Sequence, residues 1–414
     1  MEEFIQLVFQ LGVILLAAKL GGELFERFLK QPGVLGELIA GVIIGPHALG
    51  GLITLPQLGT LFDEAETVAG LPVSSELHAI AQIGVIVLLF HIGLEADLRG
   101  LLRFGGIASL IALGGVVVPF VVGVQVAILL GYADGLSDPV ALFMGTVLTA
   151  TSVGITTRVL DDIRKLRTPE GTTILGSAII DDILGVLILT VVVGIAEGEG
   201  VRVGGILGTA GKAIGFWLVL TALIVAFSDR ISRFLSAFRS QGALIALALG
   251  LVFIGAALAE LFELAAIIGA FSVGLGLSTS NIARTLRDRL RPIYDLLVPI
   301  FFVVMGMSLD VRTLGGVIGI GLLIGVLAIL TKVIGSGLPA LALRFTPIGA
   351  LRVGVGMAPR GEVALVIIGT ATAMQAVEAQ IFSVVILMVF ITTLVTPPLL
   401  LAVFNRGGVG RKVK

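Results

Sequence analysis

The chain has 414 residues, a formal net charge of −1 and no cysteine, and its mean hydropathy is +1.13. Apolar residues make up 57% and charged residues only 13% of it, whereas a soluble domain carries about 25% charged residues. This composition excludes an ordinary soluble domain. The near-zero net charge gives no attraction to nucleic acid, and the lack of cysteine excludes disulfides and thiolate metal sites. Apolar runs of about 20 residues predict membrane-spanning helices rather than the short alternating strands of a membrane barrel.

Clusters of charge and breaks at glycine and proline divide the chain into about thirteen predicted membrane spans. In chain order these are 4–28, 33–50, 76–97, 104–131, 138–158, 171–195, 203–227, 242–260, 264–281, 290–309, 313–343, 348–374 and 379–404. The first span is expected to be retained, because its acidic start is unlike the basic start of a cleavable signal peptide. The polar stretch 51–75 is expected to be an external loop.

The distribution of Lys and Arg predicts the orientation. Of the 27 basic residues, 21 fall in odd-numbered connections or in the tail 405–414, and only Arg202 and Arg312 fall in even-numbered connections. Because basic residues gather on the cytoplasmic side, the N-terminus is expected outside the cell (inner) membrane and the C-terminus in the cytoplasm. One missed helix would break this alternation, so it supports thirteen spans. The chain has no Walker motif, and no nucleotide is expected as a partner.

Two adjacent carboxylates, Asp181 and Asp182, interrupt the apolar sixth span. At about 1.5 Å per residue, Asp181 lies roughly 20 Å from the inner end of the span near Thr168. A charge near the bilayer centre costs at least about 2.5–3.5 kcal/mol, which makes it a candidate functional group. The two carboxylates could bind a bare monovalent cation or hold protons. A structural pair tied to neighbouring helices is the alternative.

Lys332 interrupts the eleventh span at a similar depth, roughly 17 Å from the inner end near Leu343. A contact between Lys332 and Asp181 would offset two insertion penalties at once. Two interpretations of Lys332 follow. It is either one half of a purely structural ion pair or a member of the proton path.

Polar breaks are expected in the twelfth and fifth spans. In the segment GMAPRGEV at 356–363, proline removes a backbone donor and glycine relaxes the chain, which predicts a break in mid-membrane. Arg360 and Glu362 would stabilise this break or take part in ion binding. In the fifth span, hydroxyl groups cluster around Thr151 and Ser152. They would face a cation together with freed carbonyl groups, or bond back to their own helix.

Three polar residues near the inner ends of their spans are expected to have lesser roles. Glu37, near the inner end of the second span, is interpreted as an interfacial or packing residue at least as readily as a transport residue. His91 and Glu95, at the inner end of the third span, are expected to be solvated.

Spans four to six and spans eleven to thirteen form two triplets of opposite orientation. Each triplet has a middle span with a polar break and a charged residue in a flanking span. Opposed triplets with paired interruptions are typical of inverted-repeat transporters, whose half-helix ends carry partial charges. Arg360 is therefore expected to help neutralise the ends of two crossed broken helices.

Several motifs occur together in this chain. They are IDDILG at 180–185, LTATSVGIT at 148–156, Lys332 and GVGMAPRGEV at 354–363, with GELIAG at 36–41, Gly45-Pro46, PIFF at 299–302 and Gly306 in support. Together they resemble bacterial sodium/proton antiporters of the NapA type, in the cation:proton antiporter superfamily, over nearly the whole chain. The resemblance implies an all-α polytopic membrane protein, with two inverted three-helix repeats, crossed discontinuous helices and a scaffold that dimerises.

The same resemblance implies a division into domains and a site. The domains are scaffold helices at 1–97 and 242–309, core repeats at 104–195 and 313–404, a linker helix at 203–227 and the tail at 405–414. Asp182 would be the principal carrier of cation and proton, sodium would bind at Asp182 and Asp181, and Asp181 would pair with Lys332. Alternating access would move the core against the scaffold of a homodimer in the lipid bilayer. No cofactor is expected beyond the transported sodium and protons.

The expected function is secondary transport that exchanges sodium (or lithium) for protons, and it is electrogenic if Lys332 releases a second proton. Potassium/proton exchange on the same scaffold is an alternative, because residue types do not fix the size of the ion cage. A gated cation channel is a further one. An enzyme is not expected, since adjacent aspartates on one helix are unlike the two facing acids of an aspartyl protease.

Overall fold

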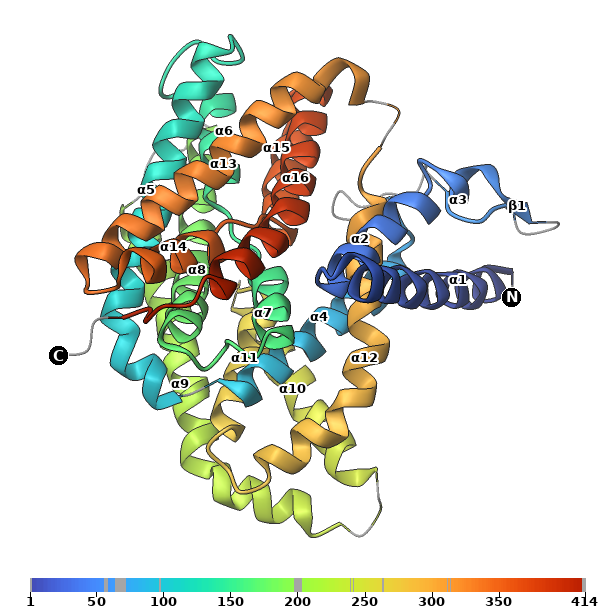
Figure 1. Ribbon diagram of the computed structural model, residues 1–414, viewed down its shortest axis with the longest axis vertical. Coiled ribbons are helices and arrows are strands. Elements are labelled where there is room, and N and C mark those ends of the chain that lie inside the picture. The colour runs from blue at the N-terminus through green and yellow to red at the C-terminus, as the bar shows by residue number, and fades with distance from the viewer. Residues whose placement is uncertain are drawn as a thin grey trace.

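The computed structural model describes residues 2–55, 59–63, 72–96, 98–196, 203–238, 240, 242–262, 264–310, 312 and 314–411. These residues are mostly helical, which confirms the all-α class. The segment between α2 and α4 also carries a short antiparallel hairpin of β1 (Thr54–Leu55) and β2 (Gly59–Thr60). The rest of the fold consists of two groups of packed helices (Figure 1).

Helix group 1 lies at the right and bottom of Figure 1. Its members are α1 (Glu2–Leu24) with its π-helical continuation η1 (Phe25–Leu29), α2 (Gly33–Ile44), α4 (Ser75–Glu95), α10 (Ala243–Leu261), α11 (Ala266–Leu277) and α12 (Ala283–Met307). Helix α4 packs against α11 and α12, and α2 packs against α1 and α12. The one-turn helix α3 (Leu49–Leu52) follows α2.

Helix group 2 lies at the upper left of Figure 1. Its members are α5 (Leu98–Leu129), α6 (Pro139–Thr149), α7 (Val153–Asp162), α8 (Pro169–Ala196), α13 (Leu314–Ala342), α14 (Pro347–Gly356), α15 (Glu362–Ala373) and α16 (Ala379–Asn405). Helix α5 packs against α6, α8 and α13, and α13 packs against α14 and α16. Helix α9 (Val203–Ser236) packs on α11 of group 1 and also reaches α8.

Helix α7 lies at the boundary between the two groups. It contacts α4 and α2 on one side and α16 and α8 on the other. Figure 1 shows it near the centre of the molecule, between the labels of α8 and α4.

The described residues include 11 helices that are long and apolar enough to cross a membrane, against thirteen predicted spans. Two predicted spans account for the difference. The span at 348–374 is divided into α14 and α15, and the span at 264–281 contains only the 12-residue helix α11. Hydroxyls of Ser278, Thr279 and Ser280 donate to carbonyls one turn back, which competes with continuation of that helix.

The two broken spans begin in the same way. Helix α6 has Asp138 as its N-cap and Pro139 at its first position, and α14 has Thr346 followed by Pro347. Each cap side chain accepts a bond from a backbone N–H of the first turn, and proline there lacks only a donor that would be unpaired anyway. Both half-helices thus start from a strong local signal and end at a polar break.

Glycines bring helices into backbone contact within each group. The close pairs are Gly21–Gly36, Gly41–Gly306, Gly93–Gly274 and Gly255–Gly269 in group 1, and Gly114–Gly335 in group 2. A Cβ added at Gly255 would collide with the Val273 side chain, and one added at any of the others would collide with backbone of the facing helix. Small residues at helix contacts are the usual means of close packing in membranes, and they explain part of the high glycine content of 56 residues.

Candidate ion-binding site

Asp181 and Asp182 lie in the middle of α8, and both are buried in the protein. One turn before them, the Ser177 hydroxyl donates to the Ala108 carbonyl of α5 over 3.1 Å. This bond fixes α8 against α5 at the level of the two carboxylates.

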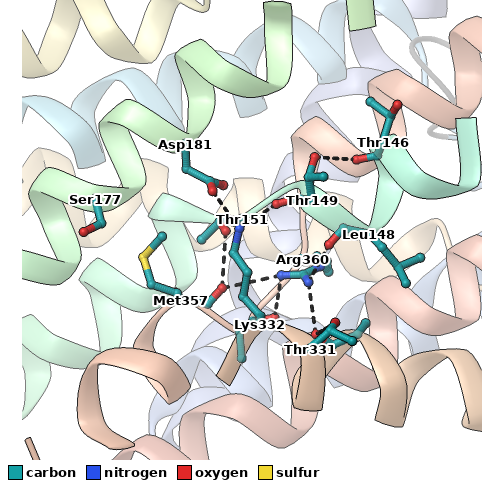
Figure 2. Close-up of polar contacts among 12 residues, drawn as sticks. Thr146, Leu148, Thr149, Thr151, Ser177, Asp181, Thr331, Lys332, Met357 and Arg360 are labelled. Atoms are coloured by element: carbon teal, nitrogen blue, oxygen red, sulfur yellow. Dashed lines mark hydrogen bonds and ion pairs between the residues drawn. The ribbon is translucent and has the colours of Figure 1, made fainter. Parts of the chain in front are cut away.

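Lys332 of α13 reaches across to α8. Its Nζ lies 2.6 Å from Oδ1 of Asp181 and donates to the Thr149 carbonyl over 2.7 Å. The Lys332 side chain is 0% exposed. Thr149 ends α6, and the last carbonyls of a helix are partly negative and lack partners inside the helix. The ammonium group therefore joins a carboxylate to the end of a broken helix, as Figure 2 shows.

Arg360 lies in the non-helical stretch between α14 and α15 and is 0% exposed. Its guanidinium donates to the carbonyl of Leu148 (2.7 Å; Figure 2) and to the carbonyls of Ala358 (3.0 Å) and Ala328 (3.1 Å). A fourth, longer bond of 3.5 Å reaches Met357. Arg360 thus satisfies carbonyls at the ends of both broken helices, which is the stabilising position that the sequence predicts for it.

Helix α16 holds the backbone of the same break in place. The N–H of Arg360 donates to the Thr392 hydroxyl over 3.2 Å, and the Thr393 hydroxyl donates to the Arg360 carbonyl over 2.7 Å. Glu362 begins α15, and its side chain lies outside the described part of the chain.

The two breaks are bonded directly to each other. The N–H of Ser152 donates to the Pro359 carbonyl over 2.8 Å, and the Thr151 hydroxyl donates to the Met357 carbonyl over 3.3 Å. The Ser152 hydroxyl caps α7. Thr151 therefore bonds to the other break rather than back to its own helix. The structure brings Asp181, Lys332, Thr151, Ser152 and Arg360 together, with Asp182 next to them on α8.

A second polar cluster at the boundary includes residues that the sequence reading did not single out. The distribution of basic residues predicts only a cytoplasmic position for Arg158 of α7, but the side chain is buried and lies 3.9 Å from Glu37 of α2. Its guanidinium also stacks on the Tyr294 ring of α12 at 5.0 Å. Arg158 and Asp162 are four residues apart, a spacing that predicts a charged face on a helix. In the structure their side chains lie 3.5 Å from each other.

The expectation that His91 is solvated is wrong. His91 is buried, lies 3.5 Å from Asp161 and packs against the Tyr294 ring at 4.7 Å. Helix α7 brings Asp161 against α4, so the histidine loses its access to water. Glu95 keeps partial exposure and bonds to Arg167 and Arg287.

A buried ion pair also joins α8 to α14. Arg352 lies 2.7 Å from Glu170, and its guanidinium donates to the carbonyls of Gly407 (2.7 Å) and Gly408 (3.2 Å). The sequence reading placed Arg352 in a connection. In the structure it clamps the segment after α16 onto group 2.

Buried charges of both signs, within reach of freed carbonyl groups, are typical of the ion pathways of membrane transporters. The model of the family described as "Sodium/hydrogen exchanger, transmembrane" matches residues 12–405. The chain belongs to the sodium/hydrogen exchanger family. This confirms the resemblance to cation:proton antiporters, and the chain is a transporter of this family and a multi-pass membrane protein.

Relatives within the family match along the full length. The chain is 36% identical to the high-affinity Na(+)/H(+) antiporter NhaS3 of Synechocystis sp., over 95% of this chain and 89% of that protein. It is 35% identical to the Na(+)/H(+)-K(+) antiporter GerN of Bacillus cereus, over 96% of each. A structure of the sodium proton antiporter MjNhaP1 from Methanocaldococcus jannaschii covers 96% of each chain with a TM-score of 0.70 and 18% identity, which shows a shared fold.

Proposed function

We propose that this protein exchanges sodium (or lithium) for protons at Asp182, with Asp181 as a second ligand of the cation. As a member of the sodium/hydrogen exchanger family, the chain is a secondary antiporter. The observation that carries the residue assignment is the buried contact of 2.6 Å between Asp181 and Lys332, directly beside Asp182 and the two helix breaks.

Antiport follows from competition for one carboxylate. Asp182 can bind a proton or a cation, but a protonated carboxyl no longer offers the full charge that a dehydrated sodium ion requires. Whichever ion is more abundant on one side displaces the other there. If the site opens to only one side at a time, the downhill flow of one ion drives the other uphill.

Lys332 adds a second proton to this scheme. Burial favours the neutral amine, whereas the neighbouring Asp181 carboxylate favours the ammonium. When sodium binds between Asp181 and Asp182, the ammonium loses its partner and releases a proton. The cycle then moves two protons for one sodium, and it is electrogenic.

Helix group 2 is proposed as the moving core and helix group 1 as the scaffold of a homodimer. The grouping of contacts supports this division, with α7 between the groups. Mass measurement in mild detergent should give twice the mass of one chain, and a fully active monomer would contradict the dimer.

The C-terminus is proposed to be cytoplasmic in the cell (inner) membrane, and a C-terminal reporter active only outside the cell would reverse this orientation.

The test of the site is Asp182→Asn in vesicles that contain a pH-sensitive dye. The variant should insert and fold, but sodium-dependent proton flux should disappear, because an amide neither ionises nor carries a proton. Asp134→Asn, at an exposed carboxylate in the α5–α6 loop, is the matched control and should transport normally. Normal flux through Asp182→Asn would contradict the assignment.

Potassium is the second candidate substrate, because the relative GerN is named an Na(+)/H(+)-K(+) antiporter. The same vesicles distinguish the two cations when sodium, lithium and potassium gradients are applied in turn. A proton response to potassium alone would replace sodium in the proposal. Cation flux that is driven by voltage and not coupled to pH would instead indicate a channel.

A further inference from the structure

A cavity of about 500 Å³ opens at the boundary between the two helix groups, where the segment between α7 and α8 faces the start of α12. Five arginines line it: Arg164 and Arg167 after α7, and Arg284, Arg287 and Arg291 at the start of α12. Three carboxylates accompany them, so the lining carries an excess of positive charge. This excess would repel sodium, and the cavity is therefore unsuited as a binding chamber for a cation.

The arginines differ in how far they are neutralised. Glu95 bonds to both Arg167 (3.0 Å) and Arg287 (3.1 Å), and Arg291 lies 3.2 Å from Asp295. Within the described residues, no carboxylate lies within ion-pair distance of Arg164 or Arg284. Two guanidinium groups, one from each side of the boundary, are thus available to an anion.

The placement of both arginines runs against local preference. Arg164 has φ of +56° after the end of α7, where the bond from the Lys165 N–H to the Leu160 carbonyl closes a turn that usually contains glycine. Arg284 is in the first turn of α12, where the helix dipole favours acidic residues. Both arginines are among the basic residues that gather on one side of the membrane, but Arg284 opposes the dipole of its helix, and both would gain from a bound anion.

We propose that this cavity binds an anion with two or more phosphate groups, held by Arg164 of group 2 and Arg284 of group 1. Guanidinium groups bind phosphate oxygens in a planar, two-bond geometry, and two separate arginines call for more than one phosphate. The volume of about 500 Å³ suits a small phosphorylated molecule or a phospholipid headgroup. Because the anion bonds to both groups, it stabilises the arrangement in which they are apposed. The resulting inhibition of exchange rests on the proposed function, whereas the binding does not.

Binding is measured by calorimetry with inorganic pyrophosphate on the full chain in detergent. The wild type should bind one pyrophosphate per chain, and Arg164→Gln with Arg284→Gln should weaken binding by about tenfold per arginine. The matched control is Arg230→Gln with Arg233→Gln, which removes the same charge from the surface of α9. Equal affinity of the two double variants, or no binding by the wild type, would overturn the site.

The melting temperature of each variant is compared with that of the wild type. If the double variant does not fold, Arg284→Lys serves instead. It keeps the charge but not the two-bond geometry, and pyrophosphate should bind several times more weakly. Unchanged affinity of this variant would also overturn the site.

The source of the phosphate is distinguished in vesicles. Exchange is measured in phosphatidylcholine vesicles with pyrophosphate on both sides, and separately in vesicles that also contain phosphatidic acid. Inhibition by pyrophosphate alone supports a soluble ligand, and inhibition by phosphatidic acid supports a lipid headgroup. Each effect should vanish in the double variant, whose exchange without phosphate should be unchanged. A wild type that binds pyrophosphate but never exchanges cations would contradict the proposed function and leave the binding site standing.

Discussion

Helix groups 1 and 2 differ in where they bury charge. Among the described Asp, Glu, His, Lys and Arg side chains of group 1, only Glu37 and His91 are buried, and both face partners on α7 of group 2. Group 2 buries seven ionisable side chains: Arg158, Glu170, Asp181, Asp182, Lys332, Arg352 and Arg360. Since every buried charge has an energetic cost, the cost is concentrated in the group that contains the two helix breaks. This supports the proposal that group 2 handles the ions.

The boundary between the groups also differs from their interiors. Inside each group, glycine pairs allow helices to touch backbone to backbone. At the boundary, an added Cβ at Gly154 would meet the Leu88 side chain of group 1 at 3.4 Å, an ordinary contact distance. Helices are therefore packed backbone to backbone within each group, whereas the two groups contact each other through side chains. This arrangement permits movement of one group relative to the other.

The largest effect is expected from Lys332→Gln, which removes the cation from the most deeply buried ion pair of group 2. Leaving Asp181 without its partner should destabilise the protein by about 3–5 kcal/mol. Exchange should either stop or continue as electroneutral exchange through Asp182. Current linked to transport in vesicles measures the charge moved per cycle. Full activity with an unchanged charge per cycle would remove Lys332 from the proton path.

A smaller effect is expected from Gly306→Ala in group 1. The added methyl group would collide with the Leu38 carbonyl and Gly41 of α2, and overpacking of this kind costs about 1–3 kcal/mol. Gly250→Ala on α10 is the control, because a Cβ there meets nothing within 4 Å. Thermal melting in detergent should separate the two variants. Equal melting temperatures would show that group 1 does not depend on close backbone contact.

Glu37→Gln examines the boundary itself. The carboxylate lies 3.9 Å from Arg158, too far for a strong ion pair, so we expect a loss of stability of about 1 kcal/mol. The effect on the rate of exchange should be larger than the effect on the free energy of unfolding, because the contact joins the two helix groups. A double-mutant cycle with Arg158→Gln measures the coupling. A coupling near zero would show that this contact does not hold the boundary.

The smallest effect is expected from Asp310→Asn, outside the membrane after α12. Hydrogen bonds from Arg312 lower the pKa of Asp310 below its usual value. A lowered pKa adds stability above the unfolded value of about 3.9, and this stability is lost as the pH falls through the lower folded value. Because the pair is partly exposed, the contribution should be below about 1 kcal/mol. Melting curves of variant and wild type should differ slightly at pH 7 and converge as the pH falls through the lowered pKa of Asp310.

The central site was predictable because charged side chains inside an apolar membrane span cost free energy and are therefore rare. Asp181 and Lys332 stand out in apolar spans, and counting residues from the inner ends placed them at one depth. The structure puts them 2.6 Å apart. Likewise, Pro359 and Gly361 predicted a break, and the break lies between α14 and α15.

The boundary cluster and the clamp were not predictable in the same way. Arg158 and Arg352 lie near span ends, where a count of basic residues treats every arginine as solvated. Their partners in the structure, Glu37 and Glu170, are carboxylates far away in the chain. Neither the spacing of charged residues nor their predicted depth in the membrane indicates these pairs. The span predicted at 264–281 contains α11 but is too long, because the hydroxyl residues that follow Leu277 do not interrupt the apolar pattern strongly enough to predict the end of the helix.

The clamp on the segment after α16 has a mechanical consequence. Arg352 holds the carbonyls of Gly407 and Gly408, and the N–H of Thr346 donates to the carbonyl of Gly410. A force applied at the C-terminal end therefore enters the protein at α14 and, through Glu170, at α8, before it reaches the end of α16. A bulky fusion attached there without a flexible linker would load the helix that carries Asp181 and Asp182.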